Sequence, residues 1–291
     1  MTENRAECIL PARGRAGGAA RAASPLADSA GCPFVWRFGE VSSTLDAAYA
    51  LRAVGGLAPW ESLQAVRQRA GRGQLRRQWH SPAGNIYATL RLPQSDPFRG
   101  TEATPSLSLM LAAAFAEWEL AVRVKWPNDL VVEKDGEAHK IAGILMEERG
   151  GILYAGIGIN VVWRPERAAL RAGAAMPAAC LAEVWPGGAD RCPCAESLWP
   201  RLVKRLYSAY SSRRSPMIGC HEAVSRLLLW QGRQVVIKDG EERVSGILAG
   251  LHPDGGARLL CGDGEKIFYS GSLHLPDDNH KGVIHGQQEL C

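Results

Sequence analysis

Four short segments of this chain combine glycine with charged or amide side chains, a composition suited to binding an anionic ligand. The first, residues 68–77, reads Gln-Arg-Ala-Gly-Arg-Gly-Gln-Leu-Arg-Arg. Its glycines allow the backbone to approach a ligand closely, and its arginines can bind a phosphate or a carboxylate. No Gly-Lys-Ser/Thr follows, so the segment is not a P-loop. Taken alone, it is more simply interpreted as a basic surface turn.

The other three segments are Lys-Trp-Pro-Asn-Asp at 125–129, Lys-Ile-Ala-Gly-Ile-Leu at 140–145 and Gly-Ile-Gly-Ile-Asn at 156–160. Asn and Asp are also ordinary turn residues. A lysine at the start of a strand, such as Lys140, is usually solvated, yet beside a buried phosphate it would supply a compact positive charge. Glycines inside a strand indicate close approach by a ligand or by another backbone. Each segment is weak evidence alone.

The elements that must position these segments follow from the apolar patterns. Ser43 to Asp46 fits a capping box that opens a helix ending near Val54. An amphipathic helix is expected from Thr104 through Leu120. Strands are expected at about 34–38, 62–68, 85–92, 122–132, 140–147 and 152–161, the last three as a β-meander.

The C-terminal third of the chain has a different pattern. Helical spacing covers about 195–214, and a last helix is expected to end near Leu229. From Gly232 to Leu275, short strands alternate with glycine-containing turns, which predicts a small β-barrel as a second domain. Residues 1–33 show no period and are predicted to be a disordered tail. The predicted fold class is therefore α+β.

Composition excludes several classes of function. The formal net charge of +4 is far from the concentrated positive face of a nucleic-acid-binding domain. The eight cysteines lack the paired spacing of a zinc framework. No apolar run approaches the roughly 20 residues that span a bilayer, and no signal-peptide core opens the chain. We therefore expect a protein of the reducing cytoplasm that binds neither DNA nor a membrane.

The order and spacing of the motifs resemble the biotin protein ligase family. A Ser-Thr helix start is followed by a Gln-x-Ala-Gly-Arg-Gly loop, a Trp-x-Ser-Pro-x-Gly-Asn run at 79–85 and the three later segments. The resemblance is strong over about residues 34–161 and looser beyond them. It implies a mixed β-sheet catalytic domain flanked by helices at 34–228, an SH3-like β-barrel at 229–277 and a flexible tail at 278–291.

The activity that the resemblance implies is that of a two-step ligase. Biotin and ATP would form biotinyl-5′-AMP and pyrophosphate, with Mg²⁺ neutralising the departing phosphates. A lysine of a biotin carboxyl carrier protein or domain would then accept the biotin. Lys140 and Arg72 would be the catalytic cations that offset repulsion between the two anions. A homodimer is left open, as is the carboxylase that carries the acceptor.

The resemblance also assigns residues to each substrate. The biotin site would be formed by Ser43, Thr44, Gln68, Gly71, Arg72, Gly73, Gln74, Trp79, Lys140 and Gly143. The nucleotide would be bound by Arg72, Arg77, Asn128, Asp129, Lys140 and Asn160, with Asp129 also the candidate metal ligand. Trp163 is a candidate for stacking on adenine. The chain departs from the family pattern at Leu45, Gln74 and Arg76, where many relatives carry Asn, Arg and Gly.

Three other functions fit parts of the pattern. A lipoate ligase would use the same adenylate chemistry on another acyl acid, but the Lys-Trp-Pro-Asn-Asp and Gly-Arg-Gly segments favour biotin. A biotin-responsive repressor would need an N-terminal helix-turn-helix, for which the irregular residues 1–33 are too few. A non-catalytic biotin-binding protein on the same scaffold would have no need of Lys140, Arg72 and Asp129.

Overall fold

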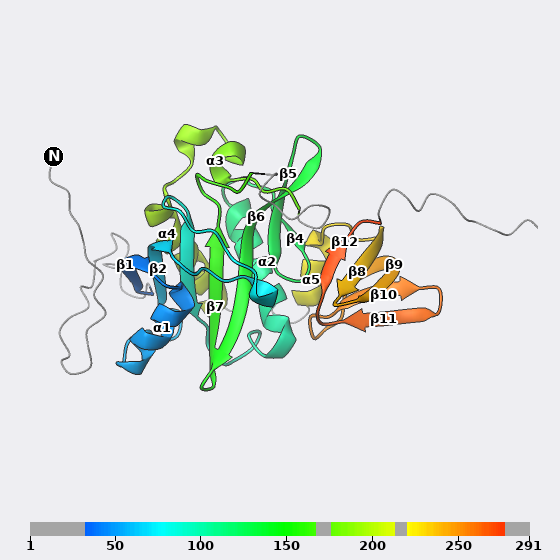
Figure 1. Ribbon diagram of the computed structural model, residues 1–291, viewed down its shortest axis with the longest axis horizontal. Helices are drawn as coiled ribbons and strands as arrows, with labels where there is room; N and C mark the ends of the chain where they lie inside the picture. Colours follow the sequence, from blue (N-terminus) through cyan, green and yellow to red (C-terminus); the bar gives the residue numbers. More distant parts are fainter. Residues whose placement is uncertain (1–32, 167–175, 213–219, 277–291) are drawn as a thin grey trace, which may run out of the picture.

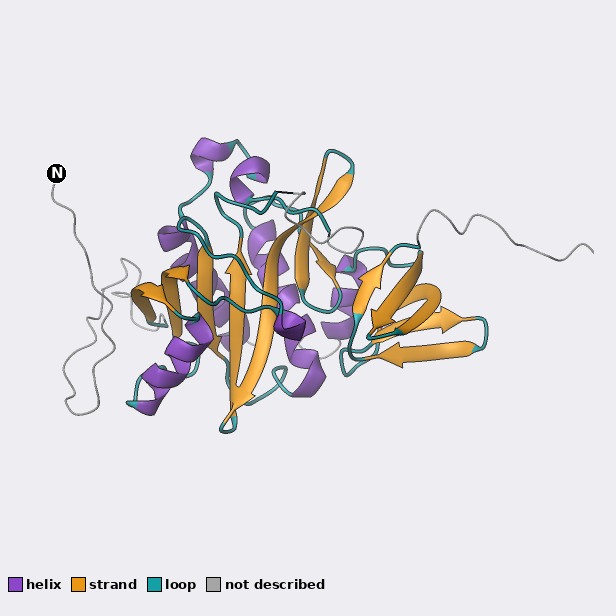
Figure 2. Ribbon diagram, viewed as in Figure 1, coloured by secondary structure: helices purple, strands orange, loops and turns teal. Residues whose placement is uncertain are grey.

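The computed structural model describes residues 33–166, 176–212 and 220–276. In this part of the chain, a large sheet stands beside a smaller one, which lies at the right in Figure 1. Figure 2 shows the helices gathered around the larger sheet. Apart from Pro33, the predicted tails at 1–33 and 278–291 lie outside the described residues and stay predictions.

The larger sheet has the strand order β1-β2-β3-β7-β6-β5-β4. Its strands are β1 Val35–Val41, β2 Ser62–Gln68, β3 Ile86–Arg91, β4 Arg123–Lys125, β5 Asp129–Lys134, β6 Glu137–Arg149 and β7 Ile152–Ile159. β1 and β2 are parallel, and the other neighbouring strands are antiparallel. The predicted mixed sheet is therefore confirmed.

The strand predicted at 122–132 is interrupted in the structure, where two strands occupy this region. A turn at residues 126–128 separates β4 from β5. Pro127 has no N–H to donate to a neighbouring strand, so a regular ladder does not continue through it. After the turn, Asp129 pairs with Gly143 of β6. The break therefore brings the polar end of the Lys-Trp-Pro-Asn-Asp segment next to the Lys-Ile-Ala-Gly-Ile-Leu segment.

Helix α1, Thr44–Ala53, covers one face of the larger sheet. Its apolar side chains form a buried cluster with Leu63 and Ala65 of β2. Strand residues alternate between the two faces of a sheet. Gln64 accordingly points to the opposite face, where its Nε2 donates to the carbonyl oxygen of Ala195 at 2.9 Å. The two faces of the sheet are thus covered by different helices.

In the described residues, the opposite face is covered by α2 Ala103–Ala116, α4 Ala195–Ser211 and α5 Cys220–Leu227. A short helix, α3 Leu181–Val184, follows α2 and precedes α4 in the chain. Helix α2 contacts β4, β5 and β6 as well as α4 and α5, so it is buried on most sides. It ends before the predicted Leu120 because Glu119 takes a positive φ of 61°, which a right-handed helix does not contain.

The C-terminal sheet has the strand order β11-β10-β9-β8-β12 and is antiparallel throughout. Its strands are β8 Gln234–Asp239, β9 Glu242–Leu251, β10 Ala257–Cys261, β11 Gly264–Phe268 and β12 Ser272–His274. This is the small β-structure that the alternating strands and turns predicted, and it agrees with the SH3-like C-terminal domain that the resemblance implies.

The two sheets share one hydrophobic core. Val235 and Leu259 of the C-terminal sheet belong to the same buried cluster as the residues beneath the larger sheet. The hydroxyl of Thr101 donates to the carbonyl oxygen of Asp254, and the indole N–H of Trp126 donates to the carbonyl oxygen of Gly255 at 3.3 Å. The C-terminal sheet is therefore packed against the larger domain, and the predicted boundary at 228–229 stays a prediction.

Among the described residues, none of the helices combines the length and the apolar composition needed to span a membrane.

Candidate active site

A cavity of about 470 Å³ lies where the start of α1, the loop at 71–79, β6 and β7 meet, with residues of β12 completing its lining. All the predicted site residues except Gly71 line it, namely Ser43, Thr44, Gln68, Arg72, Gly73, Gln74, Arg77, Trp79, Asn128, Asp129, Lys140, Gly143 and Asn160. Trp163 lines it as well. The structure therefore gathers motifs that are far apart in the sequence around one space.

Two glycines on neighbouring strands form a floor beneath Trp79. Gly143 of β6 is directly opposite Gly158 of β7. A Cβ placed on Gly158 would lie 2.6 Å from Cε2 of Trp79, and one placed on Gly143 would lie 3.1 Å from its Cζ3. The sequence indicated a close approach by a ligand or a backbone at such glycines. In the structure the close neighbour is a side chain, the indole of Trp79.

A chain of hydrogen bonds connects Trp79 to the start of α1. The side-chain oxygen of Gln68 accepts from the backbone N–H and the hydroxyl of Thr44 at 2.8 and 3.1 Å. Gln68 Nε2 donates to Ser81 Oγ at 2.9 Å, and that hydroxyl donates to the carbonyl oxygen of Trp79 at 2.9 Å. Within the described part of the chain, the buried indole N–H has no hydrogen-bond partner. An acceptor atom on a ligand would offset that cost of about 1–3 kcal/mol.

A bulge in β6 decides which way Lys140 points. Ile141 is an extra residue on β6, with no partner in β5. Regular alternation would place Lys140 and Gly143 on opposite faces, whereas the bulge brings them to the same face. A Cβ on Gly143 would lie 3.3 Å from Lys140 Nζ, and that nitrogen is 5.1 Å from the centroid of the Trp79 ring. The lysine therefore lies beside the glycine floor.

Positive charge is concentrated around one carboxylate. Lys140 Nζ lies 2.5 Å from Asp129 Oδ1, and Asp129 is the only acidic side chain among the described residues that line the cavity. Lys125 lines the cavity too, although sequence reasoning gave it no role. Burial lowers the pKa of Lys125, Asp129 opposes this, and the charges of Lys140 and Arg77 add to it. Three cations thus share one anion, which suits an anionic ligand.

Asn128 and Asn160 hold backbone around the cavity in addition to lining it. Asn128 Nδ2 donates to the carbonyl oxygen of Ile144 on β6 at 2.7 Å. Asn160 is buried, and its Nδ2 donates to the carbonyl oxygen of Ala179 at 3.1 Å. Their predicted contact with the nucleotide stays a prediction, and both have a structural role beside it.

Asn85 is a residue of the site region that sequence reasoning left without a role. Its side chain is buried. Its Oδ1 accepts from the backbone N–H groups of residues 161, 162 and 163 at 2.8, 3.0 and 3.1 Å, and its Nδ2 donates to the carbonyl oxygen of Trp163 at 2.8 Å. One side chain therefore fixes the segment that carries Trp163. Its position at the end of the Trp-x-Ser-Pro-x-Gly-Asn run was the available signal.

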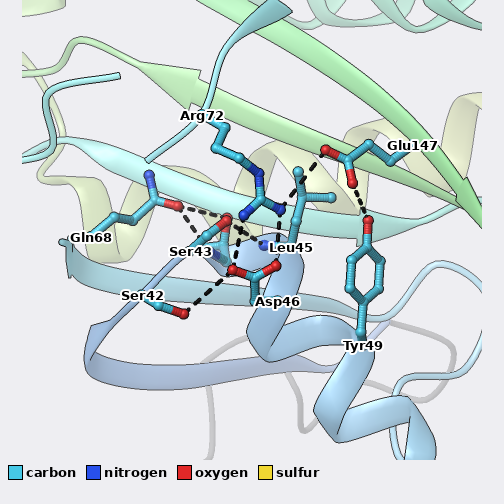
Figure 3. A network of polar contacts seen from close by, with 9 residues as sticks. Ser42, Ser43, Leu45, Asp46, Tyr49, Gln68, Arg72 and Glu147 are labelled. Atoms are coloured by element: carbon cyan, nitrogen blue, oxygen red, sulfur yellow. Dashed lines mark hydrogen bonds and ion pairs between the residues drawn. The ribbon is translucent and has the colours of Figure 1, made fainter. Parts of the chain in front are cut away.

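Arg72 lines the cavity, but its guanidinium is bound to protein carboxylates (Figure 3). Its two terminal nitrogens donate to the two oxygens of Asp46, each at 2.9 Å. One of them also lies 3.9 Å from Glu147 Oε1. Gly71 lies at the base of the same loop, in close contact with the backbone of Trp79. A side chain would not fit there, because a Cβ on Gly71 would lie 2.5 Å from the carbonyl oxygen of Trp79.

The C-terminal sheet contributes Gly271, Ser272 and His274 to the cavity lining. Nothing local in the sequence marks these residues, because their position depends on how the two sheets pack. In the described ranges, no group of three or more His, Cys, Asp or Glu side chains could hold a metal ion. Any metal here would therefore depend on Asp129 together with oxygen atoms of a ligand.

Comparison with known proteins gives three further findings on sequence. The profile of the Biotin/lipoate A/B protein ligase family matches residues 60–162. The Biotin--[acetyl-CoA-carboxylase] ligase of Paracoccus denitrificans is 29% identical over 227 residues, which are 74% of this chain and 90% of that protein. The Bifunctional ligase/repressor BirA of Escherichia coli strain K12 is 37% identical over 129 residues, which are 40% of this chain and 37% of that protein.

The fold gives a matching result. The biotin protein ligase from Aquifex aeolicus in complex with biotin and ATP is similar with a TM-score of 0.64 and 26% sequence identity. The similarity covers 82% of this chain and 97% of that one. The ordered motifs, the single cavity that they line and these similarities lead to one conclusion. Residues 60–162 match the Biotin/lipoate A/B protein ligase family, and over most of its length the chain is similar to biotin protein ligases in sequence and in fold.

Proposed function

We propose that this chain is a biotin–[biotin carboxyl carrier protein] ligase that first activates biotin with ATP. An oxygen of the biotin carboxylate attacks the α-phosphorus of ATP. The bond from that phosphorus to the bridging oxygen breaks, and pyrophosphate leaves with the bonding electron pair. The product is biotinyl-5′-AMP.

The observation that carries this proposal is the position of Lys140. It lies between the glycine floor with Trp79 and the cationic region with Asp129 and Lys125. An ammonium at this junction can contact both a carboxylate and an α-phosphate, whose mutual repulsion opposes the first step. A fixed positive charge in an enclosed site stabilises the charge that develops during the reaction.

The two ends of the cavity suit the two substrates. Ser43, Thr44 and Gln68 offer polar groups for the ureido ring of biotin, and Trp79 with the β6 strand offers an apolar wall. Arg77, Asn128 and Asn160 are assigned to the nucleotide, together with Lys125, which lines the same region as Lys140.

The second step transfers biotin to a lysine of a biotin carboxyl carrier protein or domain. The neutral amine of that lysine attacks the carbonyl carbon of the mixed anhydride and forms an amide. The bond from the carbonyl carbon to the phosphate oxygen breaks, AMP leaves with the electron pair, and the nitrogen loses a proton.

The four cysteines that the structure describes as free, Cys180, Cys192, Cys194 and Cys261, fit the reducing cytoplasm.

Mg²⁺ fits this site as an ion carried mainly by ATP. Asp129 is the one carboxylate among the described lining residues, and its Oδ1 lies 2.5 Å from Lys140 Nζ at the edge of the cavity. Mg²⁺ in nucleotide sites is commonly held by one or two carboxylates, phosphates and water. Asp129 would hold the ion, which would neutralise charge on the departing pyrophosphate.

The test is to incubate the purified chain with ATP, Mg²⁺ and either biotin or lipoate, and to identify the acyl-adenylate by its mass. We expect biotinyl-adenylate and pyrophosphate only when biotin, ATP and Mg²⁺ are all present. Comparable adenylate from lipoate would favour a lipoate ligase instead. Biotin binding without any adenylate would favour a non-catalytic protein on the same scaffold.

A further inference from the structure

One guanidinium joins three elements of the cavity wall (Figure 3). Arg72 belongs to the loop at 71–79, which supplies much of the cavity lining. Its partner Asp46 lies in the first turn of α1, and its second carboxylate neighbour, Glu147, lies on β6. The helix start that carries Ser43 and the strand that carries Lys140 are thus both connected to the loop through Arg72.

Tyr49 holds the second carboxylate in place. Its hydroxyl donates to Glu147 Oε2, and its ring packs edge-on against Tyr154, with the centroids 5.0 Å apart. The guanidinium of Arg149 lies 4.6 Å from the centroid of the Tyr49 ring. Burial, together with the bond to Glu147, raises the pKa of Tyr49 well above its usual value. Tyr49 therefore stays a hydrogen-bond donor at every working pH.

The carboxylate of Asp46 is committed to Arg72 and not to its own helix. The sequence predicted a capping box from Ser43 to Asp46, and Ser43 does cap α1 by accepting from the N–H of Leu45 at 3.3 Å. The reciprocal half of the box is replaced by the paired bonds to Arg72. Those bonds hold the pKa of Asp46 below its ordinary value. The carboxylate is thus ionised wherever Arg72 is bound to it.

Fixing Arg72 fixes the rest of the loop. Arg72 and Gln78 form an antiparallel bridge, and the N–H of Gly73 donates to the carbonyl oxygen of Arg77 at 2.8 Å. The N–H of Trp79 donates to the carbonyl oxygen of Gly71 at 2.8 Å. A movement of Arg72 away from Asp46 would therefore carry Trp79 and the rest of the loop with it.

We propose that Asp46, Glu147 and Tyr49 are positioning residues that act through Arg72 to hold the loop at 71–79 closed over the biotin end of the cavity. This arrangement sets how readily biotin is admitted and how long biotinyl-adenylate is retained. Arg72 is the side chain through which these contacts reach the loop. The inference rests on the proposed function, because the retained molecule is the adenylate.

The matched variants are Asp46→Asn, Glu147→Gln and Tyr49→Phe, each of which keeps the size of the side chain. Glu148→Gln is the control, since it makes the same charge change on the next residue of β6, where the side chain is exposed and points to the other face. All four proteins are used as full-length chains, and their thermal melts are compared first.

Two measurements follow the loop. Biotinyl-adenylate is formed from labelled biotin and chased with unlabelled biotin, which gives its dissociation rate. Trypsin cleavage after Arg72 or Arg77 reports opening of the loop. The Arg72 and Asp46 side chains are 36% and 43% exposed, so the pair is in the range of partly screened ion pairs. We expect Asp46→Asn to speed both dissociation and cleavage about fivefold, and to raise the KM for biotin similarly.

The kcat for adenylate formation at saturating substrate is expected to change little in the Asp46→Asn protein. If Arg72 serves only as a cation for the phosphates, freeing it from Asp46 will instead leave retention and cleavage unchanged while the adenylation rate stays equal or rises. That result, or equal effects in Glu148→Gln, would contradict the proposal that these residues hold the loop at 71–79 closed through Arg72. Absence of any adenylate from the parent protein would reject the proposed function and is therefore a separate outcome.

Discussion

Lys140 depends on a single extra residue for its position. Without the bulge at Ile141, the alternation of β6 would point the ammonium away from Gly143 and away from Asp129. The carboxylate then holds the ammonium at the edge of the cavity. A lysine placed in this way is fixed before the substrates arrive, so in the proposed reaction its charge would not need to reorganise.

The residue-scale prediction for this group is that Lys140→Ala loses adenylate formation far more than it loses folding stability. Removing one such electrostatic partner commonly costs on the order of 10² to 10³ in rate. Lys140→Arg should restore little of the adenylate formation, because a planar guanidinium does not fit the space of a compact ammonium. Rapid measurement of pyrophosphate release, run beside a thermal melt, tests this. The exposed Lys204→Ala on α4 is the control, and a parent-like rate in Lys140→Ala would remove Lys140 from the mechanism.

Lys125 is expected to lower the folding stability of the protein while it favours the binding of ATP. Its pKa is lowered in the folded chain, so between that value and its ordinary pKa the unfolded chain binds more protons. The free energy of unfolding therefore rises with pH across this range. Lys125→Met should stabilise the protein at neutral pH by roughly 1 kcal/mol, and the gain should shrink as the pH approaches 10 or above.

The same Lys125→Met change should raise the KM for ATP by about tenfold, because a charged contact with a phosphate is lost. Melting curves at several pH values and steady-state kinetics measure the two effects separately. A lower melting temperature together with an unchanged KM would show that Lys125 supports the fold and not the nucleotide.

At the scale of elements, the β6–β7 floor works because neither Gly143 nor Gly158 has a side chain. We predict that Gly158→Ala displaces Trp79, since the added Cβ would lie 2.6–2.8 Å from three atoms of the indole. Overpacking of this kind costs about 1–3 kcal/mol. The KM for biotin should rise more than the KM for ATP.

The control for this floor variant is Gly262→Ala, where a Cβ would meet no atom within 4 Å. Tryptophan fluorescence and separate KM measurements for the two substrates compare the variants. Equal increases for biotin and ATP would contradict the assignment of the floor to the biotin end.

Strand positions were the part of the fold that the sequence predicted best. Periodicity located β2 at the observed residues, because its side chains alternate between two covered faces. The bulge at Ile141 was beyond such reasoning, since an extra residue in a ladder depends on the partner strand. Glycine spacing indicated a close neighbour for β7, but only the folded loop shows that the neighbour is Trp79. The order of the motifs predicted which residues would share one site. The direction of the Arg72 guanidinium, toward Asp46, could be found only from the structure.

At the scale of the whole molecule, the two sheets are expected to unfold together. The buried cluster runs from the larger sheet into the C-terminal sheet without a break, and Trp126 bonds across the junction to Gly255. Calorimetry of the full chain should therefore show a single transition for both sheets. Two separate transitions would mean that the C-terminal sheet is an independent unit.

Gly255→Ala is predicted to lower that single transition. Gly255 has a φ of +92°, and an added Cβ would lie 2.7 Å from the carbonyl oxygen of Thr101. Gly264→Ala is the matched control, because Gly264 also has a positive φ but a Cβ there would meet nothing within 4 Å. The first variant should lose about 1–3 kcal/mol more than the control. Equal losses would show that the junction tolerates the methyl group.

The lining of the cavity by Gly271, Ser272 and His274 has an evolutionary consequence. A domain joined to its neighbour only by a linker can be exchanged between genes as a cassette. Here β12 is at once an edge of the C-terminal sheet and a wall of the cavity. Mutations in this last strand are therefore exposed to selection on folding and on substrate handling together. Recombination would preserve function only if it carried Thr101 and Trp126 along with their partners Asp254 and Gly255.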